Sequence, residues 1–161
     1  MLSPRRTRLA VIIVGTVALL VGPIGTAPSF ADTKELVGTW SVSITGGPGT
    51  PPLPTWYGAL ITIDRDGGLV ATITDPLITT GHGAWLKTGH RTFVVTILLR
   101  QFDAAGNFLG TLRARATIVV NREGDQFTGD PYSFEFFDQN GNPTSFAGVG
   151  TAHGTRIVVE P

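Results

Sequence analysis

Short runs of alternating apolar and polar side chains recur along the chain, and clusters of turn-forming residues separate them. In the run 36–45, Trp40, Val42 and Ile44 fall on one face, and mostly serine and threonine occupy the other face. A period of two residues is typical of a β-strand with one buried side. The 3.6-residue apolar stripe of an amphipathic helix is almost absent. The pattern therefore predicts an all-β protein.

We expect eight strands, over residues 36–45, 56–63, 69–74, 82–87, 91–102, 108–120, 127–137 and 145–159. The dipeptide Asp66-Gly67 favours a tight hairpin turn, and every later loop is also short. Short loops make neighbouring strands pair antiparallel. Closing the sheet on itself removes its exposed edges. The expected fold is a single antiparallel up-and-down β-barrel of about eight strands.

The segment 1–31 has the pattern of a cleaved export signal. Arg5, Arg6 and Arg8 precede an apolar run at 9–21, and the small residues Ser29 and Ala31 follow. The run is shorter than the roughly 20 apolar residues of a membrane-spanning helix. We therefore predict a signal peptide over 1–31, a barrel domain over 32–161 and a secreted protein. Whether export uses the general or the twin-arginine route stays open.

Charge and composition exclude several classes of function. The predicted signal holds three of the 12 Lys and Arg residues and no acid, so the remaining chain has a net charge of −3, which argues against a nucleic-acid partner. The absence of cysteine excludes zinc fingers, Cys-ligated clusters and thiol catalysis. His82, His90 and His153 lack the spacing that presents two imidazoles to one metal from a strand. We predict no metal and no cofactor.

Two short motifs carry a resemblance to a known group of barrels. Gly38-Thr39-Trp40 opens the first expected strand, and Gly154-Thr155-Arg156 lies in the last one. This combination resembles the calycins, the group of lipocalin-like and avidin-like barrels. The resemblance implies that Trp40 packs inside the closed end and that the Arg156 guanidinium lies across its indole, which fastens the first strand to the last. The helix that usually follows a lipocalin barrel and the polar set that holds biotin are not matched.

Candidate ligand-binding residues gather around one expected opening of the barrel. The proline-rich segment 46–55 follows the first strand and could cover that opening as a stiff apolar lid. Trp56 and Tyr57 come directly after it, and His82 and Trp85 lie beside flexible glycines. We expect Trp56, Tyr57, His82 and Trp85 at the rim, around a small, mainly apolar ligand. Alternate small residues at 148–154 leave space that either receives Phe134 and Phe136 or becomes a cavity.

Two other functions stay open, and so do catalysis in general and the oligomeric state. One is a barrel cyclase or isomerase of the allene-oxide-cyclase or dirigent-like type, with Tyr57, His82 and Glu135 as acid–base candidates. The other is a structural or partner-binding barrel with a filled core. Glu135 and the neighbouring Arg113 and Arg115 are interpreted more simply as an ion pair on the outer surface. We expect a small hydrophobic molecule as partner and no membrane contact once the signal is removed.

Overall fold

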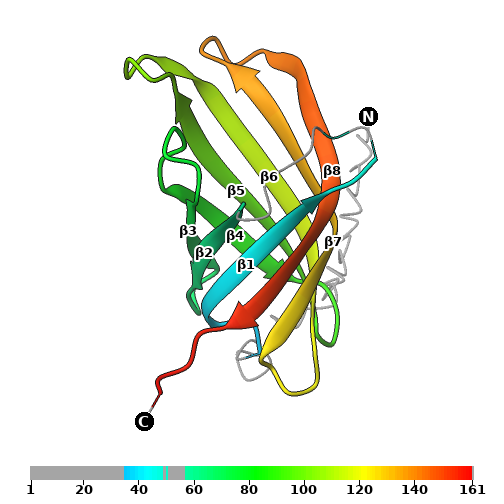
Figure 1. The fold of residues 1–161 in the computed structure, drawn as a ribbon. Coiled ribbons are helices and arrows are strands. Elements are labelled where there is room, and N and C mark those ends of the chain that lie inside the picture. Colours follow the sequence, from blue (N-terminus) through cyan, green and yellow to red (C-terminus); the bar gives the residue numbers. More distant parts are fainter. Residues whose placement is uncertain (1–34, 49, 51–56, 161) are drawn as a thin grey trace, which may run out of the picture.

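The computed structural model describes residues 35–48, 50 and 57–160, and eight strands close into one barrel within them (Figure 1). The strands are β1 (Gly38–Gly46), β2 (Gly58–Ile63), β3 (Gly68–Ile73), β4 (Gly81–Lys87), β5 (Thr92–Phe102), β6 (Phe108–Val120), β7 (Gln126–Asp138) and β8 (Pro143–Arg156). The predicted all-β, antiparallel up-and-down barrel is confirmed. The predicted signal peptide at 1–31 lies outside the described residues. No helix of the described part has the length and apolar character needed to cross a membrane.

The first and last strands close the barrel. β1 pairs antiparallel with β2 on one side and with β8 on the other. Trp40 lies opposite Ile61 of β2 and opposite Arg156 of β8. Each remaining strand pairs antiparallel with its neighbour in sequence, as the short loops require.

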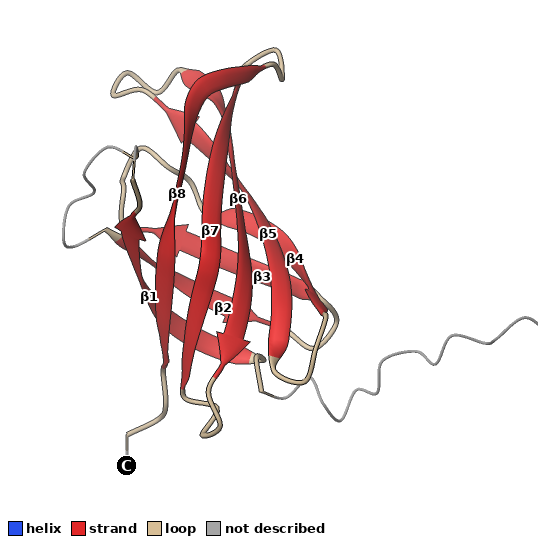
Figure 2. Ribbon diagram, turned by 90° about the vertical axis from the view of Figure 1, so that its right-hand side faces the viewer, coloured by secondary structure: helices blue, strands red, loops and turns tan. Residues whose placement is uncertain are grey.

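The two ends of the barrel differ in strand length. The turns after β2, β4 and β6 lie at the end where β1 begins, which we call the closed end; the loops after β1, β3, β5 and β7 lie at the other end, which we call the mouth. β1–β4 contain 6 to 9 residues, whereas β5–β8 contain 11 to 14. Figure 2 shows the long strands rising beyond the short ones at the mouth. The part of the barrel wall formed by β5–β8 therefore extends further at the mouth than the part formed by β1–β4.

Aromatic side chains fill the closed end. Trp40 meets Phe127 edge-on with 5.0 Å between ring centroids, and Trp85 meets Phe93 at 5.7 Å. Both indoles also find a hydrogen-bond acceptor, because Trp40 Nε1 donates to the Leu36 carbonyl at 2.9 Å and Trp85 Nε1 donates to the Asp64 carbonyl at 3.0 Å. These pairs bury large apolar surfaces without leaving an indole N–H unpaired. The closed end is thus a packed plug.

A change of register in β7 decides which side chains enter the upper interior. Pairing with both neighbouring strands is shifted just before Tyr132. Phe127 and Gly129 point inward before the shift, whereas Tyr132 and Phe134 do so after it. An extra residue in a strand has this effect, because it moves the following side chains to the opposite face. The shift brings an aromatic row to the mouth half of the barrel.

Candidate functional site

The contact between Trp40 and Arg156 anchors the closed end. The guanidinium carbon lies 4.3 Å from the centroid of the indole ring. The same guanidinium donates to the carbonyl oxygens of Glu35 at 2.6 Å, Val37 at 2.7 Å and Gly124 at 2.5 Å. Burial lowers the pKa of Arg156, and nearby Asp125 opposes that change. This group joins the segment before β1, the β6–β7 turn and β8.

Gly38 lies directly beside this guanidinium. A Cβ atom at position 38 would overlap the Nη1 atom of Arg156, and the φ angle of Gly38 is +142°. Both observations favour glycine, because it has no Cβ atom to overlap the guanidinium and because other residues rarely adopt such an angle. Gly38, Trp40 and Arg156, from the two motifs that carry the family resemblance, therefore meet at one place in the structure.

A cavity lies in the middle of the barrel, above the aromatic plug. It measures about 50 Å³ as the volume open to the centre of a water-sized sphere. Isoleucine, leucine and valine side chains form much of its wall. Four alanines from β2, β6 and β8 also contribute: Ala59, Ala114, Ala116 and Ala152. These small residues leave space where larger ones would meet, which is why the barrel is hollow at this level.

Glycine keeps one part of this wall free of side chains. A Cβ atom at Gly129 would come within 3.3 Å of the Ala152 Cβ and 3.4 Å of the Ala116 Cβ. Two other small residues of β8 are covered by aromatic rings, since Phe134 lies over Gly148 and Phe127 lies over Gly154. The expected space along 148–154 is therefore shared: rings fill its two ends, and the cavity occupies the level of Ala152.

Two phenols supply the polar side-chain atoms inside this apolar wall. Tyr57, just before β2, and Tyr132, on β7, both line the cavity. Burial raises the pKa of Tyr57, and the negative charge of Asp75 raises it further. Burial also raises the pKa of Tyr132, with a smaller contribution from Tyr57. Both groups therefore remain neutral hydroxyls at physiological pH and can act as hydrogen-bond donors.

Phenylalanines continue the apolar surface from the cavity toward the mouth. The Phe134 and Tyr132 ring centroids are 6.3 Å apart, and Phe146 lies 5.4 Å from Phe134 and 6.4 Å from Phe136. Phe146 is 49% exposed. The portion of β7 and β8 that extends beyond the short strands thus offers an apolar path from the mouth to the cavity.

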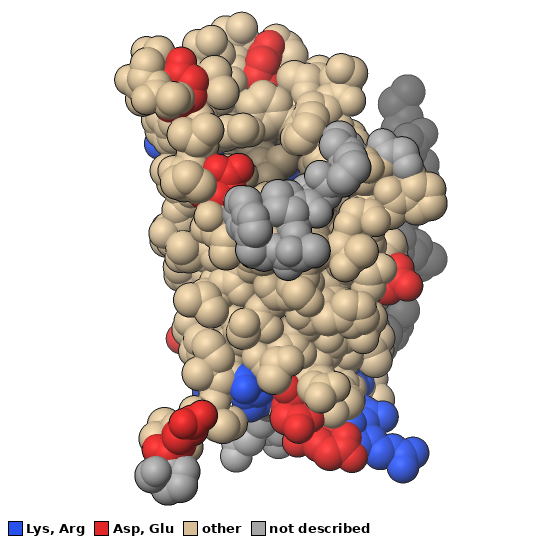
Figure 3. Space-filling model, viewed as in Figure 1, with Lys and Arg blue, Asp and Glu red and all other residues tan. Residues whose placement is uncertain are grey.

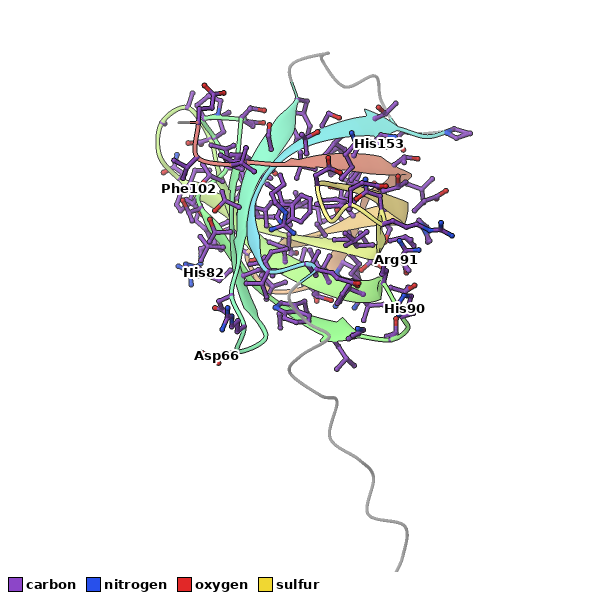
Figure 4. All side chains as sticks on the ribbon, turned by 90° about the horizontal axis from the view of Figure 1, so that it is seen from below. Asp66, His82, His90, Arg91, Phe102 and His153 are labelled. Carbon is purple, nitrogen blue, oxygen red and sulfur yellow. The ribbon has the colours of Figure 1, made fainter. Side chains whose placement is uncertain are left out.

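The four residues expected at the rim do not lie together. Trp56 lies outside the described residues, and Tyr57 lines the cavity. His82 is exposed on the outer wall (Figure 4), and Trp85 is buried at the closed end against Phe93. Neither His82 nor Trp85 lines the cavity, so the expected ligand contact of these two residues does not hold for it. His82 lies near the mouth end of β4 but points outward, because its neighbours along the strand point inward; Trp85 lies toward the closed end, because β4 runs from the mouth to that end. Sequence analysis did not single out Tyr132 for this site.

The acid–base residues considered for a cyclase are also separated. Glu135 lies on the outer face, where it accepts a hydrogen bond from Arg113 Nε at 3.0 Å. That arrangement lowers the pKa of Glu135, mainly through the Arg113 hydrogen bond. The Arg113 guanidinium also lies 4.5 Å from the Phe137 ring centroid. The simpler interpretation of this charge pair, as an outer-surface contact, matches the structure.

Histidine and acidic side chains form no group of three or more that could hold a metal ion in the described part of the chain. Figure 4 shows His82, His90 and His153 at separate positions around the barrel. Among the described residues that line the cavity, the polar side chains are the two phenols and Arg115, which lies exposed at the cavity edge. The site is therefore suited to non-covalent binding of an apolar molecule.

Comparison with known proteins adds little to this description. No family model matches the chain, and no curated protein matches it. Among solved structures, the chain is similar to one described as "Structure of EF1p2_mFAP2b bound to DFHBI". The match has 19% sequence identity and a TM-score of 0.46, and it covers 80% of this chain and 98% of the other. This similarity carries no information about a ligand of the present chain.

Proposed function

We propose that the protein binds a small, mainly apolar molecule inside its barrel. The observation that carries this proposal is the cavity between the aromatic plug and the mouth, with its wall of alanines, branched aliphatic side chains and two phenols. Apolar cavities of this kind stay dry and accept small hydrophobic molecules. Removing apolar ligand surface from water supplies the driving force.

The size of the cavity limits the ligand. The volume of about 50 Å³ counts only the positions that the centre of a water-sized sphere can reach. If that volume is treated as a sphere and its radius is extended by that of a water molecule, the enclosed space is roughly 200 Å³. That space suits a molecule with one or two rings, whereas drug-sized ligands occupy pockets of about 300–1,000 Å³. A longer ligand would have to extend along Phe134 and Phe146 toward the mouth.

The two other functions have weaker support. A cyclase would need an acid and a base facing the cavity, but Glu135 is paired on the outer face and His82 is exposed. Tyr57 and Tyr132 remain, and their raised pKa values make them donors rather than bases near neutral pH. A purely structural barrel would have no reason to keep alanine at Ala116 and Ala152, where larger apolar residues would pack the core more tightly.

Filling the cavity from within tests the proposal. Replacing Ala116→Leu places an isobutyl group in the cavity, whereas Ala84→Leu makes the same change on the exposed outer face of β4. We expect one-ring and two-ring aromatic compounds to bind the wild-type protein and Ala84→Leu, with Kd values on the order of 10⁻⁵–10⁻³ M. Ala116→Leu should bind them at least about tenfold more weakly.

Binding is measured by ¹⁹F NMR titration of fluorinated aromatic compounds, and circular dichroism checks that both variants fold. Equal binding by Ala116→Leu and Ala84→Leu would place any bound compound outside the cavity. Native mass spectrometry of protein secreted by its own host then identifies a co-purifying molecule.

We also propose that the barrel acts outside the cytoplasm, after cleavage following Ala31. The support is the basic, apolar and small-residue pattern of the segment 1–31. The intact mass of protein recovered from the culture medium provides the test. A mature chain that begins at Asp32 agrees with the proposal, and a chain that still carries the segment 1–31 contradicts it.

A further inference from the structure

The Tyr132 hydroxyl is a polar group that the apolar cavity presents to a ligand. Tyr132 lies in β7 opposite Ala116 of β6 and Gly150 of β8, and its ring lines the apolar cavity. The hydrogen bonds within the described part of the chain include none for this hydroxyl. The hydroxyl is therefore available to donate a hydrogen bond to a molecule in the cavity.

The walls around Tyr132 offer no obvious acceptor of their own among the described residues. Side chains on the facing strands are aliphatic, as at Ile97 and Leu112, and none of the side chains that line the cavity is a carboxylate or an amide. Asp75 acts on Tyr57 from the β3–β4 loop, whereas the pKa of Tyr132 responds to burial and to Tyr57 alone. The cavity thus presents a donor with no side-chain carboxylate or amide oxygen to accept from it.

Charge near the mouth argues against an anionic ligand. The mouth loops and adjoining strand ends carry Asp75, Asp103 and Asp138, and no Lys or Arg lies in residues 74–80, 103–107 or 138–142. On the face shown in Figure 3, acidic side chains are seen at both ends of the barrel, whereas Lys and Arg are seen mainly toward the closed end. A carboxylate would meet these three carboxylates at the mouth, where Arg100, near the end of β5, is the nearby base.

An anion would also remain uncompensated inside the cavity. Arg115, at the cavity edge, is exposed and acts on Glu135 of the outer face. Burying a charge without a partner is far more costly than burying a neutral polar group. The neutral Tyr132 hydroxyl therefore suits a neutral acceptor better than a carboxylate.

We propose that the molecule bound in the cavity is uncharged and carries one hydrogen-bond acceptor, such as a ketone, quinone or ether oxygen, which accepts a hydrogen bond from the Tyr132 hydroxyl. The rest of the molecule is a compact hydrocarbon of one or two rings that fills the alanine-lined space. This inference rests on the proposed binding function and adds the chemical class of the ligand.

Three probes of nearly equal shape test it: 4-fluoroacetophenone, 4-fluorocumene and 4-fluorobenzoate. The first offers a neutral acceptor, the second replaces the carbonyl oxygen with a methyl group, and the third carries a negative charge. Their affinities for wild-type protein, Tyr132→Phe and Tyr57→Phe are measured by ¹⁹F NMR titration. Phenylalanine keeps the ring at 132 and removes only the hydroxyl, and circular dichroism verifies the fold.

We expect the ketone to bind wild-type protein better than benzoate. The ratio of ketone affinity to cumene affinity should fall about three- to tenfold in Tyr132→Phe, because that factor corresponds to the net contribution of one neutral hydrogen bond. The ratio should fall less in Tyr57→Phe. An unchanged ratio in Tyr132→Phe, or tighter binding of benzoate than of the ketone, overturns the inference while cumene binding still supports the proposed function. Failure of all three probes to bind would count against both.

Discussion

The guanidinium of Arg156 lies over the indole of Trp40, with 4.3 Å between the guanidinium carbon and the ring centroid. The two residues also face each other in the β1–β8 ladder. Together with its three bonds to carbonyl oxygens, this contact ties the last strand to both the segment before β1 and the β6–β7 turn. The closed end is therefore held by one side chain that joins three segments distant in sequence, its own strand included.

Replacing Arg156→Ala should destabilise the barrel by about 2–4 kcal/mol, because it removes the cation–π contact and leaves the carbonyls of Glu35, Val37 and Gly124 without this donor. Arg156→Lys should recover only part of the loss, since an ammonium cannot reach three acceptors in a fixed plane. Urea unfolding followed by circular dichroism measures both effects.

Arg113→Ala is the matched control for this prediction. Its guanidinium lies 4.5 Å from the Phe137 ring and pairs with Glu135, but on the outer face of the barrel. Exposed pairs of this type contribute about 0–1 kcal/mol. A loss for Arg113→Ala as large as that for Arg156→Ala would show that the carbonyl bonds are not what distinguishes the closed end.

The sequence was sufficient to predict the barrel and its closure, because alternation, turn residues and short loops all indicate one fold. Strand ends were harder to locate. The strand expected to end at residue 159 stops at Arg156, after which the Ile157 N–H donates to Thr39 O, and Val159 is 96% exposed. An apolar residue beyond the last paired position has the composition of a strand but no ladder to join.

The misplacement of Trp85 could have been avoided by tracking the two ends of the barrel. β1 starts at the closed end, so every even-numbered strand runs from the mouth toward the closed end. Trp85 lies three positions before the turn residue Thr88 and therefore belongs to the plug. A motif of glycine, histidine and tryptophan alone does not show this, because it gives neither the direction of the strand nor the face.

Trp85→Phe should consequently lower stability and leave ligand binding unchanged. Phenylalanine removes the indole N–H that pairs with the Asp64 carbonyl and leaves a void beside Phe93, which together cost about 1–3 kcal/mol. Thermal unfolding measures the first effect, and titration with a fluorinated aromatic compound measures the second. Weaker binding by a fully folded Trp85→Phe protein would contradict this prediction and show that Trp85 contributes to the ligand site.

Tyr132 illustrates what the sequence pattern leaves undetermined. Strict alternation from Phe127 would place Tyr132 on the outer face, but the register shift before it turns the side chain inward. Alternation from Tyr132 onward places Tyr132 and Phe134 on one face, but alternation alone does not show which face lines a cavity. That depends on the small residues of two neighbouring strands, as at Ala116 and Ala152.

Gly154 should not tolerate a side chain, because its inner face is covered by the Phe127 ring. A Cβ atom at 154 would lie 2.5 Å from Phe127 Cδ1 and closer still to two other ring carbons. We expect Gly154→Ala to destabilise the protein by about 1–3 kcal/mol through overpacking. Guanidinium unfolding of the single and double variants measures the coupling with Phe127→Leu.

In the Phe127→Leu background, the smaller side chain can move aside, so the additional cost of Gly154→Ala should be lower. Strict additivity of the two substitutions would instead indicate that the effect of Gly154→Ala arises from backbone conformation rather than from contact with the ring.

Alkaline titration tests the burial of the two phenols directly, since Tyr57 and Tyr132 are the only tyrosines of the chain. Burial raises both pKa values above the ordinary 10.0. In the unfolded chain both phenols ionise around pH 10, whereas in the folded barrel they hold their protons to higher pH. The stabilisation from these groups is therefore fully present below pH 10 and declines as the pH rises above it.

Tyrosinate absorbance near 295 nm follows this ionisation, and circular dichroism follows unfolding in the same samples. At pH 10 the folded protein should show far less than half of the final tyrosinate signal, and the component from Tyr132 should appear only together with unfolding, because its pKa is raised further than that of Tyr57. Protein unfolded in concentrated urea, the control, should titrate around pH 10 as one step. Half-ionisation of both phenols at pH 10 in a folded barrel would show that water reaches the cavity, and the apolar site would then lack its main physical basis.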